Sequence, residues 1–100
     1  MHMRMKFLVA TALLLPAAAF AADLAKGHRV YMQHCANCHG PGGMSVMAGT
    51  PNLARQEGLR QPDMMLLQTI KAGRRGQPPF MGILSDPDIL DALAYARTLR

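Results

Sequence analysis

Cys35, Cys38 and His39 are the residues of this chain most clearly suited to chemistry, and they lie in the order Cys-Ala-Asn-Cys-His. Two thiols three positions apart fit one turn of helix, so both can reach the two vinyl groups of a single porphyrin. The adjacent histidine then lies beneath the macrocycle, where its imidazole can bind iron. The spacing predicts covalent attachment of haem c through Cys35 and Cys38, with His39 as the proximal iron ligand.

Two other chemistries use a cysteine pair at this spacing. A thioredoxin-like dithiol requires a βαβ context, and strand-like alternation is almost absent from this sequence. A zinc site usually has four ligands and a second cysteine pair, whereas this chain has two cysteines in all. His28 and His34 precede the motif at helical spacing, and we expect them on the surface. Haem is the preferred interpretation, and the other two stay open at this stage.

The first 21 residues are organised like a signal peptide. Arg4 and Lys6 give a basic start, an apolar run covers residues 7–15, and a small-x-small pattern ends at Ala21. The whole apolar stretch is shorter than the roughly 20 residues that span a bilayer. We therefore expect a signal peptide over 1–21, a single domain over 22–100, a periplasmic location and no stable membrane insertion after cleavage.

The composition argues against two broad classes of function. Without Arg4 and Lys6, nine basic residues remain against six acidic ones, and no basic run is interleaved with aromatic residues as in many nucleic-acid-binding proteins. No Ser-His-Asp set, carboxylate pair or phosphate-binding glycine loop indicates catalysis. The expected domain is small, so a covalently held haem would supply part of its core.

Helical patterns flank the motif and must position it. Residues 24–36 carry apolar side chains at spacings of three and four, and Gly27 within them permits the close approach of another element. Glycines and prolines predict loops over 40–52 and 73–84. A helix is expected to begin at Pro62-Asp63 and to end at Gly73. Ser85 and Asp88 then have the spacing of a capping box for a last helix.

These pieces, in this order, resemble a small bacterial class I c-type cytochrome. The resemblance implies an all-α fold in which three to four helices surround a covalently bound haem, with the first and last helices crossing at Gly27 and Tyr95. It also implies that the Pro51 carbonyl accepts a hydrogen bond from His39 and that Leu53 packs on the haem. The segments that carry it are Gly27 and Tyr31, Cys35 to Gly40, Thr50-Pro51-Asn52-Leu53, and Leu84-Ser85-Asp86 leading into Tyr95-Ala96-Arg97-Thr98-Leu99.

The chain departs from this family where the sixth iron ligand is usually supplied. Relatives have a methionine before a Pro-x-Phe sequence, seven residues ahead of the leucine of Leu-Ser-Asp, and Gln77 holds that position here. Met81 lies in the same loop and would reach the iron if the loop shifted its register. We favour Met81 as the distal ligand, with Gln77 as the alternative. Other candidates are Met44, Met47, Met64 and Met65.

The resemblance implies a one-electron carrier and not an enzyme. Its partners would be a reductase, an oxidase or a dehydrogenase, and the chain could also serve as a subunit of such a complex. An open or weakly held distal position would instead favour a haem protein that binds small ligands, acting as a sensor or with weak peroxidase activity. The sixth ligand decides between these alternatives.

Overall fold

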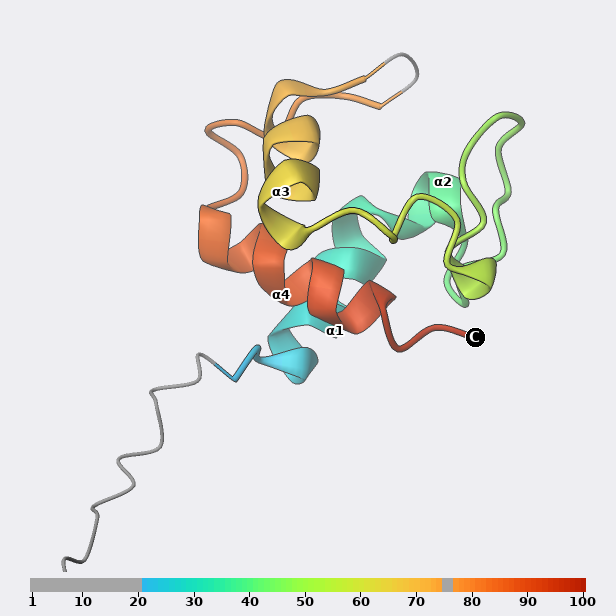
Figure 1. Ribbon diagram of the computed structural model, residues 1–100, viewed down its shortest axis with the longest axis horizontal. Coiled ribbons are helices and arrows are strands. Elements are labelled where there is room, and N and C mark those ends of the chain that lie inside the picture. The colour runs from blue at the N-terminus through green and yellow to red at the C-terminus, as the bar shows by residue number, and fades with distance from the viewer. Residues whose placement is uncertain (1–20, 75–76) are drawn as a thin grey trace, which may run out of the picture.

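A computed structural model describes residues 21–74 and 77–100, so the predicted signal peptide lies outside the described residues except for Ala21. Within these ranges the only extended pairing is an isolated bridge between Arg74 and Gln77, which agrees with the all-α prediction. Figure 1 shows the helices grouped around a shared interior, with long loops between them. The elements are α1 (Leu24–His34), α2 (Ala36–His39), the 3-10 turn η1 (Leu53–Arg55), α3 (Asp63–Ala72) and α4 (Asp86–Ala96).

The cysteine motif lies at a junction between two helices. Helix α1 begins at Asp23, whose side chain accepts a hydrogen bond from the Lys26 amide at 2.9 Å. Its expected continuation to residue 36 is interrupted at Cys35, where the backbone leaves the ideal helix (φ −111°, ψ −32°) before the single turn of α2. The His39 amide donates to the Cys35 carbonyl at 3.0 Å, so the motif itself keeps a helical turn.

Helix α4 begins as the sequence predicts. The Asp88 amide donates to the Ser85 hydroxyl at 3.3 Å, and the Ser85 amide donates to the Asp88 carboxylate at 3.2 Å. This reciprocal pair is a complete capping box, and Pro87 lies in the first turn, where no amide hydrogen is needed. The start of the last helix is therefore specified locally, within four residues.

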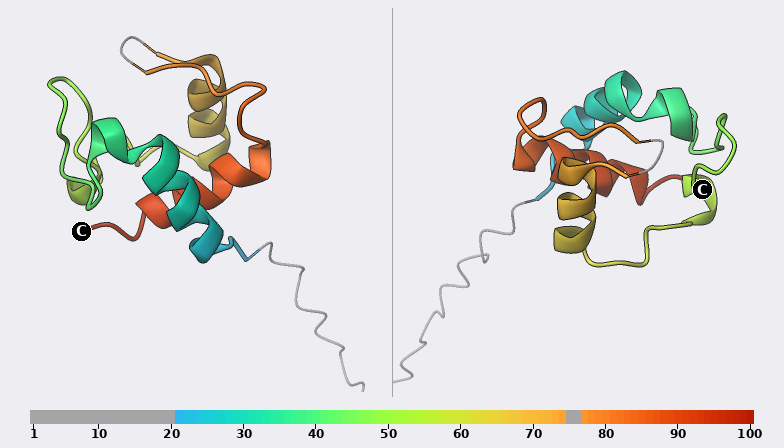
Figure 2. Two further views of the ribbon diagram at one scale, coloured as in Figure 1. Left: turned by 180° about the vertical axis from the view of Figure 1, so that it is seen from behind. Right: turned by 90° about the horizontal axis from the view of Figure 1, so that it is seen from above.

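Helices α1 and α4 cross in close contact, as both views in Figure 2 show. A methyl group added at Gly27 would lie 2.1 Å from the Asp91 carbonyl oxygen and 3.1 Å from Tyr95 Cβ. The two backbones can approach this closely only because residue 27 has no side chain. Next to this point, the rings of Tyr31 and Tyr95 pack with centroids 5.3 Å apart. The predicted crossing is confirmed.

Polar contacts hold the same crossing at its edge. The Asp23 amide donates to one oxygen of Asp91 at 3.0 Å, and the Lys26 ammonium lies 2.8 Å from the other oxygen. Lys26 also pairs with Asp88 at 3.2 Å. Hydrogen bonds from these two carboxylates raise the pKa of Lys26. The start of α1 is thus tied to the first two turns of α4.

Arg97 fixes the other end of α4. Its guanidinium donates to the Asp63 carboxylate at 2.7 and 3.1 Å, to the Gln61 carbonyl at 3.0 Å and to the Leu59 carbonyl. A basic residue at this end of a helix is favoured by the negative end of the helix dipole. The structure adds a long-range function, because Arg97 joins α4 to the segment that leads into α3.

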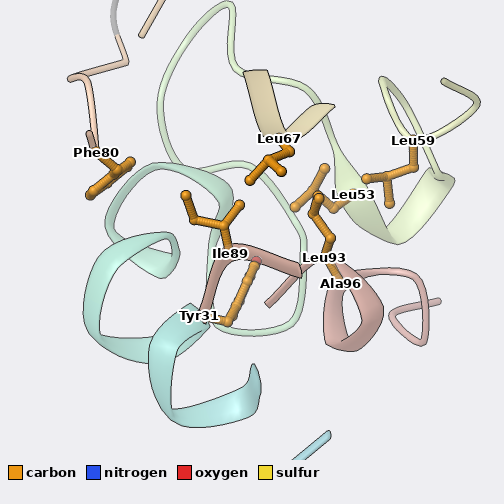
Figure 3. Close-up of a cluster of buried hydrophobic side chains, with 8 residues drawn as sticks. All are labelled: Tyr31, Leu53, Leu59, Leu67, Phe80, Ile89, Leu93 and Ala96. Atoms are coloured by element: carbon orange, nitrogen blue, oxygen red, sulfur yellow. The ribbon is translucent and has the colours of Figure 1, made fainter. Parts of the chain in front are cut away.

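One apolar cluster lies between these elements, and Figure 3 shows its side chains, which come from α1, η1, α3, α4 and two loop residues. Tyr31 of α1, Leu67 of α3 and Ile89 of α4 are each only 1% exposed. The cluster does not fill the interior, because a cavity opens beside it. Its members are Tyr31, Leu53, Leu59, Leu67, Phe80, Ile89, Leu93 and Ala96.

Candidate functional site

A cavity of about 610 Å³ lies between α2 with its following loop on one side and α3 with the 73–84 loop on the other. This volume is within the range of about 300–1,000 Å³ typical of sites for organic ligands and cofactors. Its walls are mainly apolar, and they include Leu53, Phe80 and Ile89 of the buried cluster. The cavity is therefore suited to a large, mostly apolar molecule.

Cys35, Cys38 and His39 all line this cavity. Cys35 stands at the end of α1, and the turn of α2 brings Cys38 and His39 to the same wall. Both cysteines are free thiols in this structure, and both are partly buried. The three residues that the sequence analysis singled out are thus brought together, at the edge of a space large enough for a porphyrin.

The protonation of Cys35 counts against the dithiol alternative. Burial, with a smaller contribution from the neighbouring Cys38, raises the pKa of the Cys35 thiol to about 11. Redox-active cysteine pairs instead depend on a thiol pKa below the ordinary value, because the thiolate is the nucleophile. The environment of Cys35 favours the neutral thiol at physiological pH.

The described residues also offer little to a zinc ion. Within 21–74 and 77–100, no group of three or more His, Cys, Asp or Glu side chains is arranged to hold a metal ion. A structural zinc site uses four such ligands at tetrahedral positions. Cys35, Cys38 and His39 do not form such a set within the described residues.

His39 is held by a hydrogen bond that the resemblance implied. Its Nδ1 lies 3.0 Å from the Pro51 carbonyl oxygen. A carbonyl only accepts, so Nδ1 carries the proton and the Nε2 lone pair is free to bind a metal. Such a bond orients the ring and makes the imidazole a stronger donor. The expected His39–Pro51 contact is confirmed.

Tyr31 links the motif to the helix crossing. Its hydroxyl donates to the Gly40 carbonyl at 2.5 Å, directly after His39, and its side chain also lines the cavity. Burial, with smaller contributions from Cys35 and Tyr95, raises the pKa of Tyr31 to about 12. The phenol is therefore a neutral donor at physiological pH. Leu53, the other expected contact of the haem, is 7% exposed and lies in the cavity wall.

The two candidates for the distal position are placed differently. Gln77 is half-buried and lines the cavity, on the loop that follows α3. Met81 is 65% exposed and is not part of the cavity wall. Among the other four methionines considered, Met47 alone lines the cavity. The arrangement within the described residues thus favours Gln77 over Met81, in contrast to our preference from the sequence.

His34 is a site residue that the sequence analysis placed wrongly. We expected it on the surface, but it is half-buried in the cavity wall, with its ring edge-on to Phe80 at a centroid distance of 5.7 Å. The available signal was its position directly before Cys35. A residue adjacent to the attachment motif must lie near whatever the motif holds. His28 is exposed as expected, with its ring 4.9 Å from Tyr95.

Taken together, the residues of this site fit a haem. The cavity has the volume for a porphyrin, two thiols lie at its wall at the required spacing, and an oriented imidazole has its Nε2 free. The apolar side chains of the cavity would exclude water from a bound haem, and such a dry pocket is what a protein supplies to this cofactor.

Comparison with known proteins gives matches over most of the chain. Residues 22–95 match the family described as cytochrome c oxidase, cbb3-type, subunit III. A cytochrome c6 of Thermosynechococcus vestitus is 40% identical over 92 residues, which are 87% of this chain and 81% of that protein. A cytochrome c6 of Thermostichus vulcanus is 40% identical over 81 residues, covering 78% of this chain and 71% of that protein.

A larger protein matches over the same domain. The cbb3-type cytochrome c oxidase subunit FixP of Bradyrhizobium diazoefficiens is 36% identical over 80 residues, which are 77% of this chain but 28% of that protein. No solved structure gave a significant match.

Among the described residues, no helix has both the length and the apolar character needed to cross a bilayer.

Proposed function

We propose that this chain, which belongs to the small monohaem c-type cytochromes of class I, carries single electrons in the periplasm. Electron transfer by a covalently bound haem c is the function that its relatives support. The observation that carries the proposal is the meeting of Cys35, Cys38 and the oriented imidazole of His39 at one cavity.

We assign covalent attachment of the haem to Cys35 and Cys38, and proximal ligation of the iron to His39 through Nε2. The haem supplies the one-electron redox chemistry when it is bound. The Pro51 carbonyl holds the His39 ring and increases its donor strength. Leu53 and its apolar neighbours exclude water from that face of the cavity. A dry, preformed environment lowers the structural reorganisation that accompanies a change of charge.

We further propose that residues 1–21 are a signal peptide and that the mature protein begins at Ala22. The basic start, the short apolar run and the small residues before Ala22 support this assignment. Export also suits a chain whose two cysteines must meet haem outside the cytoplasm. We expect export to give a periplasmic protein that comprises residues 22–100.

The protein itself is proposed as a carrier and not an enzyme, with a reductase, an oxidase or a dehydrogenase as its partner. One relative is by name a subunit of a cytochrome c oxidase, which supports a role beside or within such a complex. A net excess of basic residues would favour an acidic docking surface on the partner.

Expression of the full sequence in a bacterium that matures c-type cytochromes tests this proposal. The coloured protein should appear in the periplasmic fraction with an N-terminus at Ala22, and its potentiometric titration should fit a single one-electron step. Matched expression without residues 1–21 should give colourless protein in the cytoplasm. A cytoplasmic pigment, or a purified protein that undergoes no reversible one-electron step, would overturn the proposed role.

A further inference from the structure

We propose that Gln77 is the distal residue of this haem site, and that the sixth coordination position is held weakly enough to admit a small uncharged ligand such as a diatomic gas. The inference rests on the proposed function, because it requires haem on Cys35 and Cys38. It adds a second property, reversible ligand binding, to electron transfer.

The backbone of Gln77 is fixed beside the cavity. The Gln77 amide donates to the Arg74 carbonyl at 2.8 Å, and the Arg74 amide donates to the Gln77 carbonyl at 3.1 Å. These two bonds use the main chain of Gln77 and not its side-chain amide. That side chain belongs to a half-buried residue of the cavity wall. In Figure 1 this loop runs on from the end of α3, apart from α2.

The register of the same loop keeps Met81 outside. The Phe80 amide donates to the Ile70 carbonyl and the Met81 amide donates to the Lys71 carbonyl, both at 3.2 Å. Phe80 is 8% exposed and belongs to the buried cluster. A shift that carried Met81 inward would break both bonds to α3 and draw Phe80 out of the core. The sulfur of Met81 is therefore separated from the cavity by the fold itself.

Among the described residues, Met47 is the one methionine that lines the cavity. It lies four residues before Pro51, on the segment whose carbonyl orients His39. Met44, Met64 and Met65 are exposed by 58, 61 and 59% and lie outside the cavity lining. Within the described residues, Gln77 lines the cavity at the sequence position where the family resemblance places the sixth ligand.

An amide at this position has different chemistry from a thioether. The oxygen of Gln77 is a hard, neutral donor, whereas a soft thioether sulfur binds ferrous iron well. A small ligand can displace a weak oxygen donor, and the amide nitrogen can then donate a hydrogen bond to it. Leu66, Ile70 and Phe80 line the same cavity as Gln77, and these apolar side chains suit an uncharged ligand.

The test uses the mature protein with its haem, as wild type and as the variants Gln77→Met, Met81→Ala and Met64→Ala. Met64 is a matched control, because it is an exposed methionine outside the cavity. Two spectra are recorded for each protein. The oxidised form is examined for the far-red band of iron bound to methionine sulfur, and the reduced form is mixed with carbon monoxide.

The wild type, Met81→Ala and Met64→Ala should all lack the far-red band and should all bind carbon monoxide. Gln77→Met should gain the band, and its carbon monoxide affinity should fall by about tenfold or more. A far-red band in the wild type that Met81→Ala removes would overturn the inference in favour of Met81. A band that survives in Met81→Ala would overturn it in favour of another methionine.

The two proposals fail in distinguishable ways. A wild-type protein that lacks covalent haem would overturn the proposed function, and this inference with it. A wild-type protein with covalent haem, a far-red band and no reaction with carbon monoxide would overturn only the inference about Gln77. Failure of Gln77→Met to mature would leave the spectra of wild type and Met81→Ala to decide.

Discussion

The two halves of this small protein are the crossing of α1 and α4 and the region around the cavity, and their interiors are filled differently. At the crossing of α1 and α4, the interior is filled by the chain itself, to the point that Gly27 has no room for a methyl group beside Asp91. Next to the buried cluster, residues of α1, α3, α4 and the loops line a cavity of about 610 Å³. The crossing is packed by the polypeptide alone, whereas the region around the cavity has room for a cofactor.

This difference indicates what each half requires to be stable. The crossing depends on backbone approach and close packing, which any change of volume disturbs. The region around the cavity depends on haem, a large apolar group that covalent bonds keep in place. A domain of this size buries little apolar surface by itself and commonly needs such support. Disruption of the two halves should therefore have distinct consequences.

The largest effect should follow from removal of the cofactor. The double variant Cys35→Ala, Cys38→Ala cannot bond haem at the cavity. We therefore expect this variant to lose the pigment and most of its helical circular dichroism. The far-ultraviolet spectrum of the exported protein measures this directly. A colourless protein that keeps full helicity and unfolds cooperatively would show that both halves are complete without haem.

A change at the crossing should be the next largest. Gly27→Ala places a methyl group 2.1 Å from the Asp91 carbonyl oxygen, so the free energy of unfolding should fall by about 3 kcal/mol or more. Urea unfolding measures the loss. Gly42→Ala is the matched control, because nothing lies within 4 Å of its added methyl group. Equal effects of the two substitutions would contradict the account of the crossing.

Tyr31 joins the two halves, and its hydroxyl should make an intermediate contribution. Tyr31→Phe leaves the Gly40 carbonyl without its donor and should lower the free energy of unfolding by about 1–2 kcal/mol. The variant should also change the alkaline behaviour. The pKa of Tyr31 is about 12 in the folded protein and 10.0 without the fold, so wild-type stability should fall as the pH rises from 10 towards 12.

Thermal unfolding across this alkaline range provides the measurement. The decline in the melting temperature should be shallower in Tyr31→Phe than in the wild type, since phenylalanine has no proton to lose. Parallel declines in the two proteins would mean that other groups account for the alkaline loss.

The smallest effect should come from the cap of α4, far from the cavity. Ser85→Ala removes one side of the capping box and should cost about 1 kcal/mol of unfolding free energy. Hydrogen bonds from Ser85, followed by Lys26, hold the pKa of Asp88 below its ordinary 3.8. This contribution is complete above that pH and is lost as the pH falls below it, so acid unfolding should begin at a higher pH in the variant. An unchanged acid midpoint would contradict this assignment.

Local signals predicted the parts of this fold that are specified over a few residues. The capping box at Ser85 and the glycine in α1 follow from short patterns, and both are found as expected. The bond from His39 to Pro51 was implied by the family resemblance, and the structure contains it. These features depend on spacing along the chain, which a sequence displays directly.

The features that the sequence did not predict depend on contacts between residues that are far apart in the chain. Arg97 reaches Asp63 and the carbonyls before it, 34 to 38 positions away, and no local pattern reports such contacts. The exclusion of Met81 follows from bonds between its loop and the end of α3, which fix a register that composition cannot show. The burial of His34 against Phe80 likewise joins segments that are far apart in sequence.

Peptide mass shows whether haem is bonded covalently to Cys35 and Cys38 at the cavity. Trypsin should release residues 30–55 as one peptide, because no lysine or arginine lies between Arg29 and Arg55. Our account predicts that this peptide alone carries the added mass of one haem, even after denaturation and extraction with acidic acetone. The unmodified mass for this peptide, with the pigment recovered in the acetone, would contradict the account.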